Sequence, residues 1–279
     1  MSLDLVVQGP ALDARHIERL AALSGATDVD KTSPSAVRFK SVRTREGVRN
    51  YCEHAHLDHA FVEAARRLAD FRLLAMDMDS TLVTIECIDE IADLRGLKSE
   101  VATVTASAMR GEIDFPESLR RRVALLKGLE EKALQQVYDE RLSLSAGAEV
   151  MLDALKRNRI RTLLVSGGFA FFTERLKQRL GLDYTLSNEL EVVDGKLTGR
   201  VEGSIVDGKA KAARFRSLIG ELGITREQAI ALGDGANDLP MLAEAGVSVA
   251  YHAKPAVRAR ATYCLDHVGL DGLLAIFPG

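Results

Sequence analysis

The segment Leu73-Leu74-Ala75-Met76-Asp77-Met78-Asp79-Ser80-Thr81 begins with four apolar residues and continues directly into two aspartates. Short apolar runs of this kind are typical of strands buried in a sheet. Similar runs occur at residues 162–165, 229–232 and 247–250, with helical patterns between them. Near-continuous apolar strands that alternate with helices predict an α/β fold, a Rossmann-like doubly wound parallel sheet with helices on both faces.

Polar residues follow three of these runs at the point where each predicted strand ends. They are Asp77 and Asp79, then Ser166-Gly167-Gly168, and then Gly233-Asp234-Gly235-Ala236-Asn237-Asp238, with Lys211 23 residues before Asp234. Ligands of parallel sheets bind outside the carboxyl ends of the strands, so we expect these residues to converge at one edge. A small site rich in oxygen atoms suits Mg²⁺ and phosphate.

These residue types suit the transfer of a phosphoryl group. A carboxylate such as that of Asp77 can attack phosphorus and form an acyl phosphate, which water later cleaves. Mg²⁺ would screen the repulsion between two anions, and Lys211, Ser166 and the backbone N–H groups near Gly167 could hold the phosphate oxygens. Asp79 lies two residues from the nucleophile. We expect it to protonate the leaving oxygen and then to take a proton from the attacking water.

In the order and spacing of these motifs the chain resembles the haloacid dehalogenase (HAD) superfamily. The resemblance covers Asp77-x-Asp79-x-Thr81, Ser166, Lys211 and the run 233–238. It implies that Asp77 is the nucleophile and Asp79 the general acid and base. It also implies a Mg²⁺ ion held by the Asp77 carboxylate, the Asp79 backbone carbonyl and the Asp234 carboxylate. Asp238 would support this metal site without binding the ion.

From about residue 73 onward the chain is similar to the phosphoserine phosphatase family within that superfamily. The segments that carry this similarity are 77–83, Glu86, 115–127, 166–169 and 233–241. The resemblance implies hydrolysis of O-phospho-L-serine to L-serine and phosphate through an aspartyl phosphate, the last step of serine biosynthesis. Its implied substrate contacts are Glu86 for the amine, Arg122 for the carboxylate, Met109 and Phe115 for the apolar side, and Ser166, Gly167, Gly168, Lys211 and Asn237.

Three zones are expected along the chain. Residues 71–84 and 146–279 form the predicted catalytic core, and residues 85–145 form a cap of about four helices inserted after the first core strand. Gly96, Gly111 and Gly128 stand where cap helices would end, and Asp114 with Glu117 resembles an N-terminal capping box.

Residues 1–70 form the third zone, which we expect to be a small α+β, ACT-like regulatory domain. The pattern predicts strands over 5–7 and 36–42 and helices over 11–23 and 59–68. The strand at 36–42 alternates in polarity, and an exposed edge there could pair across a homodimer. The domain could also sense an amino acid such as L-serine.

The composition fits an ordinary globular protein. The 279 residues are 47% hydrophobic and 28% charged, with a formal net charge of −3, so no basic excess points to nucleic acid. Three cysteines without metal-ligand spacing argue against a disulfide framework or a zinc site and favour a cytoplasmic location. We expect no signal peptide and no membrane span.

Several alternatives stay open at this level. A phosphotransferase could move the phosphoryl group to another small alcohol, and an amino-acid-sensing protein could carry a degenerate phosphatase domain. A non-catalytic, receiver-type switch is a third alternative, although Asp79 argues against it. Glu86 and Arg122 could be surface charges of cap helices, and Lys211 a solvated helix lysine. His252 and Cys87 are interpreted as packing residues.

Overall fold

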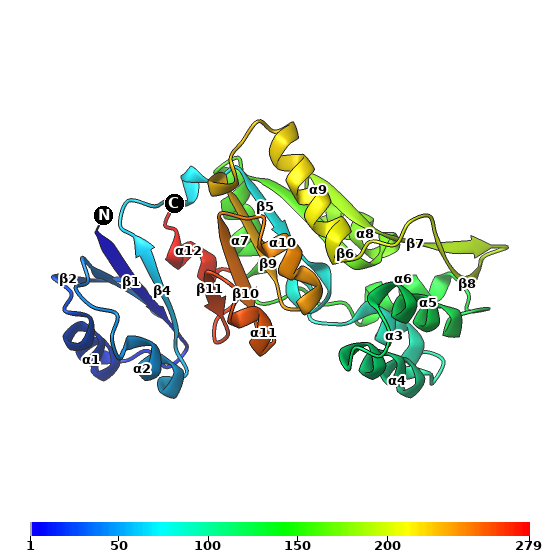
Figure 1. Cartoon of the computed structure of the whole chain (residues 1–279), viewed down its shortest axis with the longest axis horizontal. Coiled ribbons are helices and arrows are strands. Elements are labelled where there is room, and N and C mark those ends of the chain that lie inside the picture. The colour runs from blue at the N-terminus through cyan, green and yellow to red at the C-terminus, as the bar shows by residue number, and fades with distance from the viewer. Residues whose placement is uncertain (1) are drawn as a thin grey trace.

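The computed structural model describes residues 2–279, so Met1 of the predicted N-terminal domain lies outside the described residues. Figure 1 shows a small N-terminal unit at one end, a sheet flanked by helices in the middle, and a group of helices at the other end. Within the described residues no helix is both long enough and apolar enough to cross a bilayer.

The central sheet has the strand order β11-β10-β9-β5-β6-β7-β8 across residues 2–279. The strands are β5 (Leu73–Met76), β6 (Arg161–Phe169), β7 (Tyr184–Val193), β8 (Lys196–Glu202), β9 (Ala229–Gly233), β10 (Val247–Tyr251) and β11 (Tyr263–Leu265). Neighbouring strands are parallel except β7 and β8, which form an antiparallel hairpin. The four predicted core strands are confirmed as β5, β6, β9 and β10, whereas the sequence analysis missed the hairpin and β11.

Helices cover both faces of this sheet. They are α7 (Ala148–Arg157), α8 (Ala170–Leu180), α9 (Gly208–Glu221), α10 (Leu239–Leu242), α11 (Pro255–Arg258) and α12 (Gly272–Ile276). Successive residues of β5 point to opposite faces, so Leu74 and Met76 pack in one apolar cluster and Leu73 and Ala75 in another. This burial on both faces explains why the strand reads as a continuous apolar run.

The cap lies between β5 and α7 in the chain. It consists of α3 (Cys87–Asp93), α4 (Lys98–Met109), α5 (Phe115–Leu125) and α6 (Lys132–Glu140), as the sequence predicts. Gly96, Gly111 and Gly128 follow α3, α4 and α5 with φ of 67°, 76° and 81°, a backbone conformation that favours glycine. The Asp114 carboxylate accepts a hydrogen bond from the Glu117 N–H at 2.8 Å and so caps α5.

The hairpin of β7 and β8 holds the cap from the side of the core sheet. The Gly128 N–H donates to the Leu197 carbonyl and the Leu197 N–H donates to the Leu129 carbonyl, both at 2.8 Å. These hydrogen bonds attach the cap to the core in addition to the two chain segments that connect them.

The N-terminal unit has the order βαββαβ. Its elements are β1 (Leu3–Gln8), α1 (Ala14–Ser24), β2 (Asp28–Ser33), β3 (Ala36–Lys40), α2 (Val48–Ala55) and β4 (Asp58–Glu63). They form an antiparallel sheet of order β2-β3-β1-β4, a split βαβ arrangement.

Two expectations for this unit are wrong. The helix expected over 59–68 is largely the strand β4, whose burial alternates from residue to residue as in a strand, and the helix lies earlier, at α2. The strand expected over 36–42 exists as β3, but it lies between β2 and β1 and is buried up to Phe39. It therefore offers no free edge for pairing across a dimer.

The sheet of this unit has its own helices on one face and the core on the other. Leu5 and Val7 pack in the unit's own cluster, whereas Val6 joins the large cluster of the core. The buried Arg38 guanidinium donates to the carbonyls of Ala275 (3.1 Å) and Ile276 (2.8 Å) at the end of α12. The contact surface between unit and core is therefore both apolar and hydrogen-bonded.

Candidate active site

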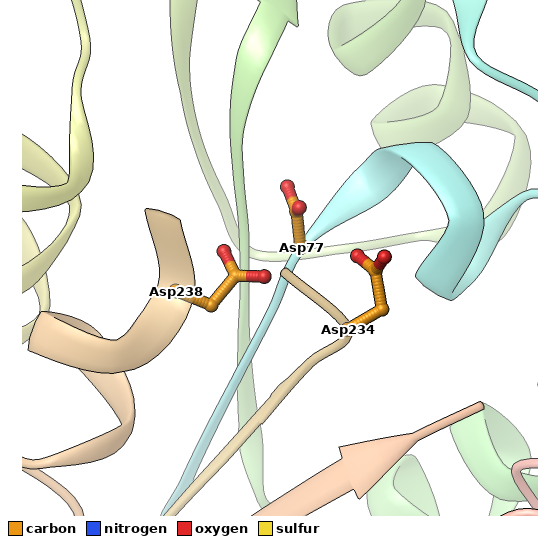
Figure 2. Close-up of side chains that lie close together, drawn as sticks. All are labelled: Asp77, Asp234 and Asp238. Carbon is orange, nitrogen blue, oxygen red and sulfur yellow. The ribbon is translucent and has the colours of Figure 1, made fainter. Parts of the chain in front are cut away.

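Three carboxylates meet at the carboxyl edge of the central sheet. Asp77 directly follows β5, Asp234 directly follows the neighbouring strand β9, and Asp238 directly precedes α10. One oxygen of each lies within 4.8 Å of the others, and Figure 2 shows the three side chains converging. Asp77 and Asp238 are buried and Asp234 is half-buried.

Lys211 connects two of these carboxylates. It comes from α9 and is 1% exposed, and its Nζ lies 2.7 Å from Asp77 Oδ1 and 2.8 Å from Asp238 Oδ1. Burial by itself would lower the pKa of Lys211, but the carboxylates of Asp238 and Asp77 outweigh it and raise the pKa above its usual value. The interpretation as a solvated helix lysine is therefore wrong.

Burial and mutual repulsion act on these carboxylates even though the Lys211 ammonium lies beside Asp77 and Asp238. Burial, and next the charge of Asp238, raise the pKa of Asp77 well above its usual range and that of Asp234 to about 6. A bound divalent cation reverses this effect because it favours the ionised carboxylates.

The donor set fits such a cation. Asp238 has both oxygens engaged, Oδ1 by Lys211 and Oδ2 by the Gly235 N–H at 3.1 Å. Within residues 2–279 the side-chain hydrogen bonds of Asp77 are accepted by Oδ1, from Lys211 at 2.7 Å and from the Met78 N–H at 2.8 Å. Asp234 Oδ1 accepts from the Thr81 hydroxyl at 3.5 Å. Asp77 and Asp234 can thus each offer a carboxylate oxygen as a hard ligand.

Asp79 and Ser166 face each other across the edge. Asp79 Oδ1 accepts from the backbone N–H of Cys87 at 3.0 Å, and Asp79 Oδ2 lies 3.4 Å from Ser166 Oγ. Burial raises the pKa of Asp79, and the Cys87 N–H opposes this shift. A Cβ on Gly168 would stand 2.7 Å from Asp79 Oδ2, so only glycine permits this approach.

The sequence analysis missed Asn188, which fixes the glycine turn. This buried side chain from β7 donates to the Gly167 carbonyl at 2.8 Å and accepts from the Val206 N–H at 2.7 Å. No motif marks Asn188 in the sequence, because its partners lie in other segments of the chain.

A cavity of about 540 Å³ separates the carboxylates from the cap. The predicted site residues in its lining are Asp77, Asp79, Glu86, Met109, Phe115, Arg122, Ser166, Gly167, Gly168, Asp234 and Asn237. Lys211 and Asp238 do not line it and lie behind Asp77. Met109 is 71% exposed, at the mouth. Thr105, Ser118 and Lys254 also line the cavity and were not predicted.

The cap places one cation and one carboxyl group in this cavity. Arg120 and Arg121 lie within 3.9 Å and 2.7 Å of Glu117, whereas Arg122 turns to the cavity with its Nε 3.4 Å from the Ser118 carbonyl. On the exposed N-terminal side of α3, Glu86 Oε1 accepts from Ser80 Oγ at 2.9 Å.

Glu86 is exposed to solvent and lines the cavity together with Asp77, Asp79 and Asp234. Partial desolvation by the walls of the cavity, and next the charge of Asp79, raise the pKa of Glu86 to about 7. Glu86 and Arg122 both line the cavity, whereas Arg120 and Arg121 face Glu117.

Comparisons with known proteins agree with this geometry. The family model described as haloacid dehalogenase-like hydrolase matches residues 74–243, and a model of a domain of unknown function matches residues 5–48. The phosphoserine phosphatase of a Polaromonas species is 55% identical over 215 residues, which are 75% of this chain and 91% of that protein.

Two solved structures extend the comparison. A HAD family hydrolase from Salmonella enterica serovar Typhi has a TM-score of 0.90 at 32% identity and covers 100% of this chain and 99% of its own. A structure described as a phospho-aspartyl intermediate analogue of phosphoserine phosphatase has a TM-score of 0.70 at 40% identity, over 74% of this chain and 99% of its own. The chain belongs to the haloacid dehalogenase-like hydrolases and, within them, to the phosphoserine phosphatase family.

Proposed function

We propose that the protein hydrolyses O-phospho-L-serine to L-serine and phosphate through an aspartyl phosphate on Asp77. One observation carries this proposal: a single cavity has a carboxylate held by Lys211 at its core end and the pair Glu86 and Arg122 on its cap side. The first end suits phosphoryl transfer, and the second suits the ammonium and carboxylate of an amino acid. The names of the relatives support the same substrate.

The Asp77 carboxylate attacks phosphorus, and the bond from phosphorus to the serine oxygen breaks as the acyl phosphate forms. Asp79 protonates the leaving serine oxygen. Its raised pKa supports this role, because a buried carboxyl group holds a proton more readily. Asp79 then accepts a proton from the water that attacks phosphorus, and the bond from phosphorus to Asp77 breaks to release phosphate.

We assign Mg²⁺ to the Asp77 and Asp234 carboxylates and the Asp79 carbonyl, with Asp238 fixed behind them by Lys211 and Gly235. When bound, the ion supplies positive charge that offsets the repulsion between nucleophile and phosphate.

The remaining lining residues orient the substrate. Ser166, Gly167, Gly168 and Asn237 bind phosphate oxygens in this assignment, with Lys211 behind the nucleophile. Met109 and Phe115 pack against the aliphatic part of the substrate. A Cβ on Gly167 would stand 2.7 Å from the Phe115 ring, so this glycine lets the cap approach the core.

A screen of phosphate release tests the proposed function. Phosphoserine should be hydrolysed with a far higher kcat/KM than p-nitrophenyl phosphate, which lacks both the ammonium and the carboxylate. Adding glycerol as an acceptor should leave the yield of free phosphate unchanged, which separates hydrolysis from the less favoured phosphotransferase activity. No preference for phosphoserine over p-nitrophenyl phosphate contradicts the substrate assignment.

For residues 1–70 we propose an ACT-like regulatory role, beside a core of 71–84 and 146–279 and a cap of 85–145. The βαββαβ order and the antiparallel sheet of the unit support this assignment. Since β4 lies beside β11, with the Tyr263 hydroxyl donating to the Phe61 carbonyl at 3.3 Å, a homodimer would use the other edge, β2. We also propose a cytoplasmic location.

Titration of the full chain with L-serine tests the regulatory role, with calorimetry for binding and light scattering for assembly. A change in activity requires that serine bind two states of the enzyme with different affinity. Binding only in competition with phosphoserine would assign the serine to the active site instead.

A further inference from the structure

One buried hydroxyl in the cap has no partner in the protein. Among the buried side-chain nitrogen and oxygen atoms of residues 2–279, Thr105 Oγ1 is the one that makes no hydrogen bond. Buried polar groups are nearly always paired, because an unpaired one loses its bonds to water without compensation. The hydroxyl therefore calls for a partner that comes from outside the chain.

The position of Thr105 indicates that this partner would bind in the active-site cavity. Thr105 lines the active-site cavity from α4, on the same helix face as Ala108 and Met109, three and four residues later. A threonine in a helix commonly bonds to the carbonyl four residues earlier, and Thr103 does so, with its hydroxyl 2.9 Å from the Ser99 carbonyl. Thr105 makes no such bond: its hydroxyl is covered by protein, while the residue itself lines the cavity.

Arg122 is the cation that the cap contributes to this cavity. This residue lines the same cavity from α5, which packs against α4. Within residues 2–279, the side chain of Arg122 donates one hydrogen bond, from Nε to the Ser118 carbonyl. Both of its Nη groups are therefore available to a ligand. Glu86, which would bind an ammonium, is held by Ser80 of the core loop. The cap wall of α4 and α5 thus offers donors, and Glu86 at the start of α3 offers an acceptor.

We propose that Thr105 binds the substrate and that its hydroxyl donates a hydrogen bond to the α-carboxylate held by Arg122. This inference rests on the proposed function and adds a specificity-determining residue to it. Arg122 supplies the charge, and Thr105 supplies a donor fixed on a second helix. Together they favour phosphomonoesters that carry a carboxylate over those that lack one.

Steady-state kinetics of Thr105→Val test the proposal, because valine keeps the shape and removes the hydroxyl. For phosphoserine we expect kcat/KM to fall about tenfold to a hundredfold, mainly through KM, as for the loss of a hydrogen bond to a charged group. O-phosphoethanolamine keeps the ammonium and lacks the carboxylate, so its kcat/KM should stay within about twofold. Thr105→Ser should restore most of the activity toward phosphoserine.

Two controls separate this role from a structural one. Thr103→Val, on the same helix and away from the cavity, should leave the kinetics with both substrates unchanged. The melting temperature of Thr105→Val should equal or exceed that of the unmodified protein, because an unpaired buried hydroxyl is lost.

The outcomes distinguish this inference from the proposed function. If the unmodified protein does not hydrolyse phosphoserine, the proposed function fails. If it does and Thr105→Val affects both substrates equally, or neither, the inference is wrong. A lower melting temperature with equal losses for both substrates would make Thr105 a structural residue.

Discussion

The ammonium group of Lys211 lies between two carboxylates, 2.7 Å from Asp77 Oδ1 and 2.8 Å from Asp238 Oδ1. This contact fixes one oxygen of Asp77 and leaves the other toward the cavity. Because Asp77 and Lys211 are both almost fully buried, water does not weaken their interaction. The candidate nucleophile is thus oriented before any substrate binds.

Asp77→Asn should lower kcat for phosphoserine by several orders of magnitude. The amide keeps the shape and an acceptor for Lys211, but it is no longer an anionic nucleophile. The fold should persist, as measured by circular dichroism. Asp153→Asn, at an exposed position of α7, is the control and should retain full turnover. A tenth of normal turnover in Asp77→Asn excludes the covalent mechanism.

Removal of divalent cations with EDTA should abolish phosphate release, and Mg²⁺ should restore it. Ca²⁺ should not restore it, because Ca²⁺ takes more ligands in a looser geometry than Mg²⁺. Asp234→Asn should raise the Mg²⁺ concentration needed for half-maximal activity, since it removes one charged ligand. Undiminished turnover in the chelator would refute the metal assignment.

Arg122→Ala should lower kcat/KM for phosphoserine by about 30-fold to 5,000-fold, which corresponds to the roughly 2–5 kcal/mol lost with one partner of a buried charged pair. The loss for p-nitrophenyl phosphate should be far smaller, because this ester has no carboxylate. Arg121→Ala is the matched control, since Arg121 lies next in the chain and pairs with Glu117 on the outer face of α5. Equal losses with both substrates would give Arg122 a structural role.

Glu86→Gln should stabilise the metal-free protein more at pH 8 than at pH 5. The pKa of Glu86 is about 7 in the folded protein and 4.5 in the reference state, so the folded state holds the proton more tightly. Ionisation of Glu86 therefore opposes folding as the pH rises from about 4.5 to about 7, and glutamine lacks this ionisation. The difference in melting temperature between variant and unmodified protein should grow across that interval. A difference that is constant with pH contradicts the assignment.

Arg38→Ala should destabilise the protein by about 3–5 kcal/mol, because it leaves the buried Asp4 carboxylate without its partner. Arg38 lies 3.2 Å from Asp4 and also holds the carbonyls at the end of α12. Turnover measured well below the melting temperature should not change, since this contact lies outside the cavity lining. Arg15→Ala, which breaks an exposed pair with Asp13, should have little effect on stability. An unchanged melting temperature in Arg38→Ala would show that the N-terminal unit is only loosely attached.

The sequence by itself determined four adjacent strands of the core sheet, β10, β9, β5 and β6, and the group of candidate catalytic residues. Strands such as β5 are buried on both faces, so they appear as apolar runs whatever their partners are. Parallel strands end at the same edge, so Asp77 and Asp234 could be placed together from their positions alone. The four cap helices were likewise visible, because glycines and Asp114 mark their ends locally.

Only the tertiary structure showed that the neighbours of Arg122 turn away from the cavity to Glu117, and that Lys211 lies behind Asp77 and outside the cavity lining. It also placed β3 inside its sheet, showed β4 where a helix was expected, and left the hydroxyl of Thr105 without a partner. Each of these facts depends on contacts between segments far apart in the chain. Local patterns record the period of an element and its ends, whereas strand order, helix rotation and hydrogen-bond partners are set by packing against distant residues.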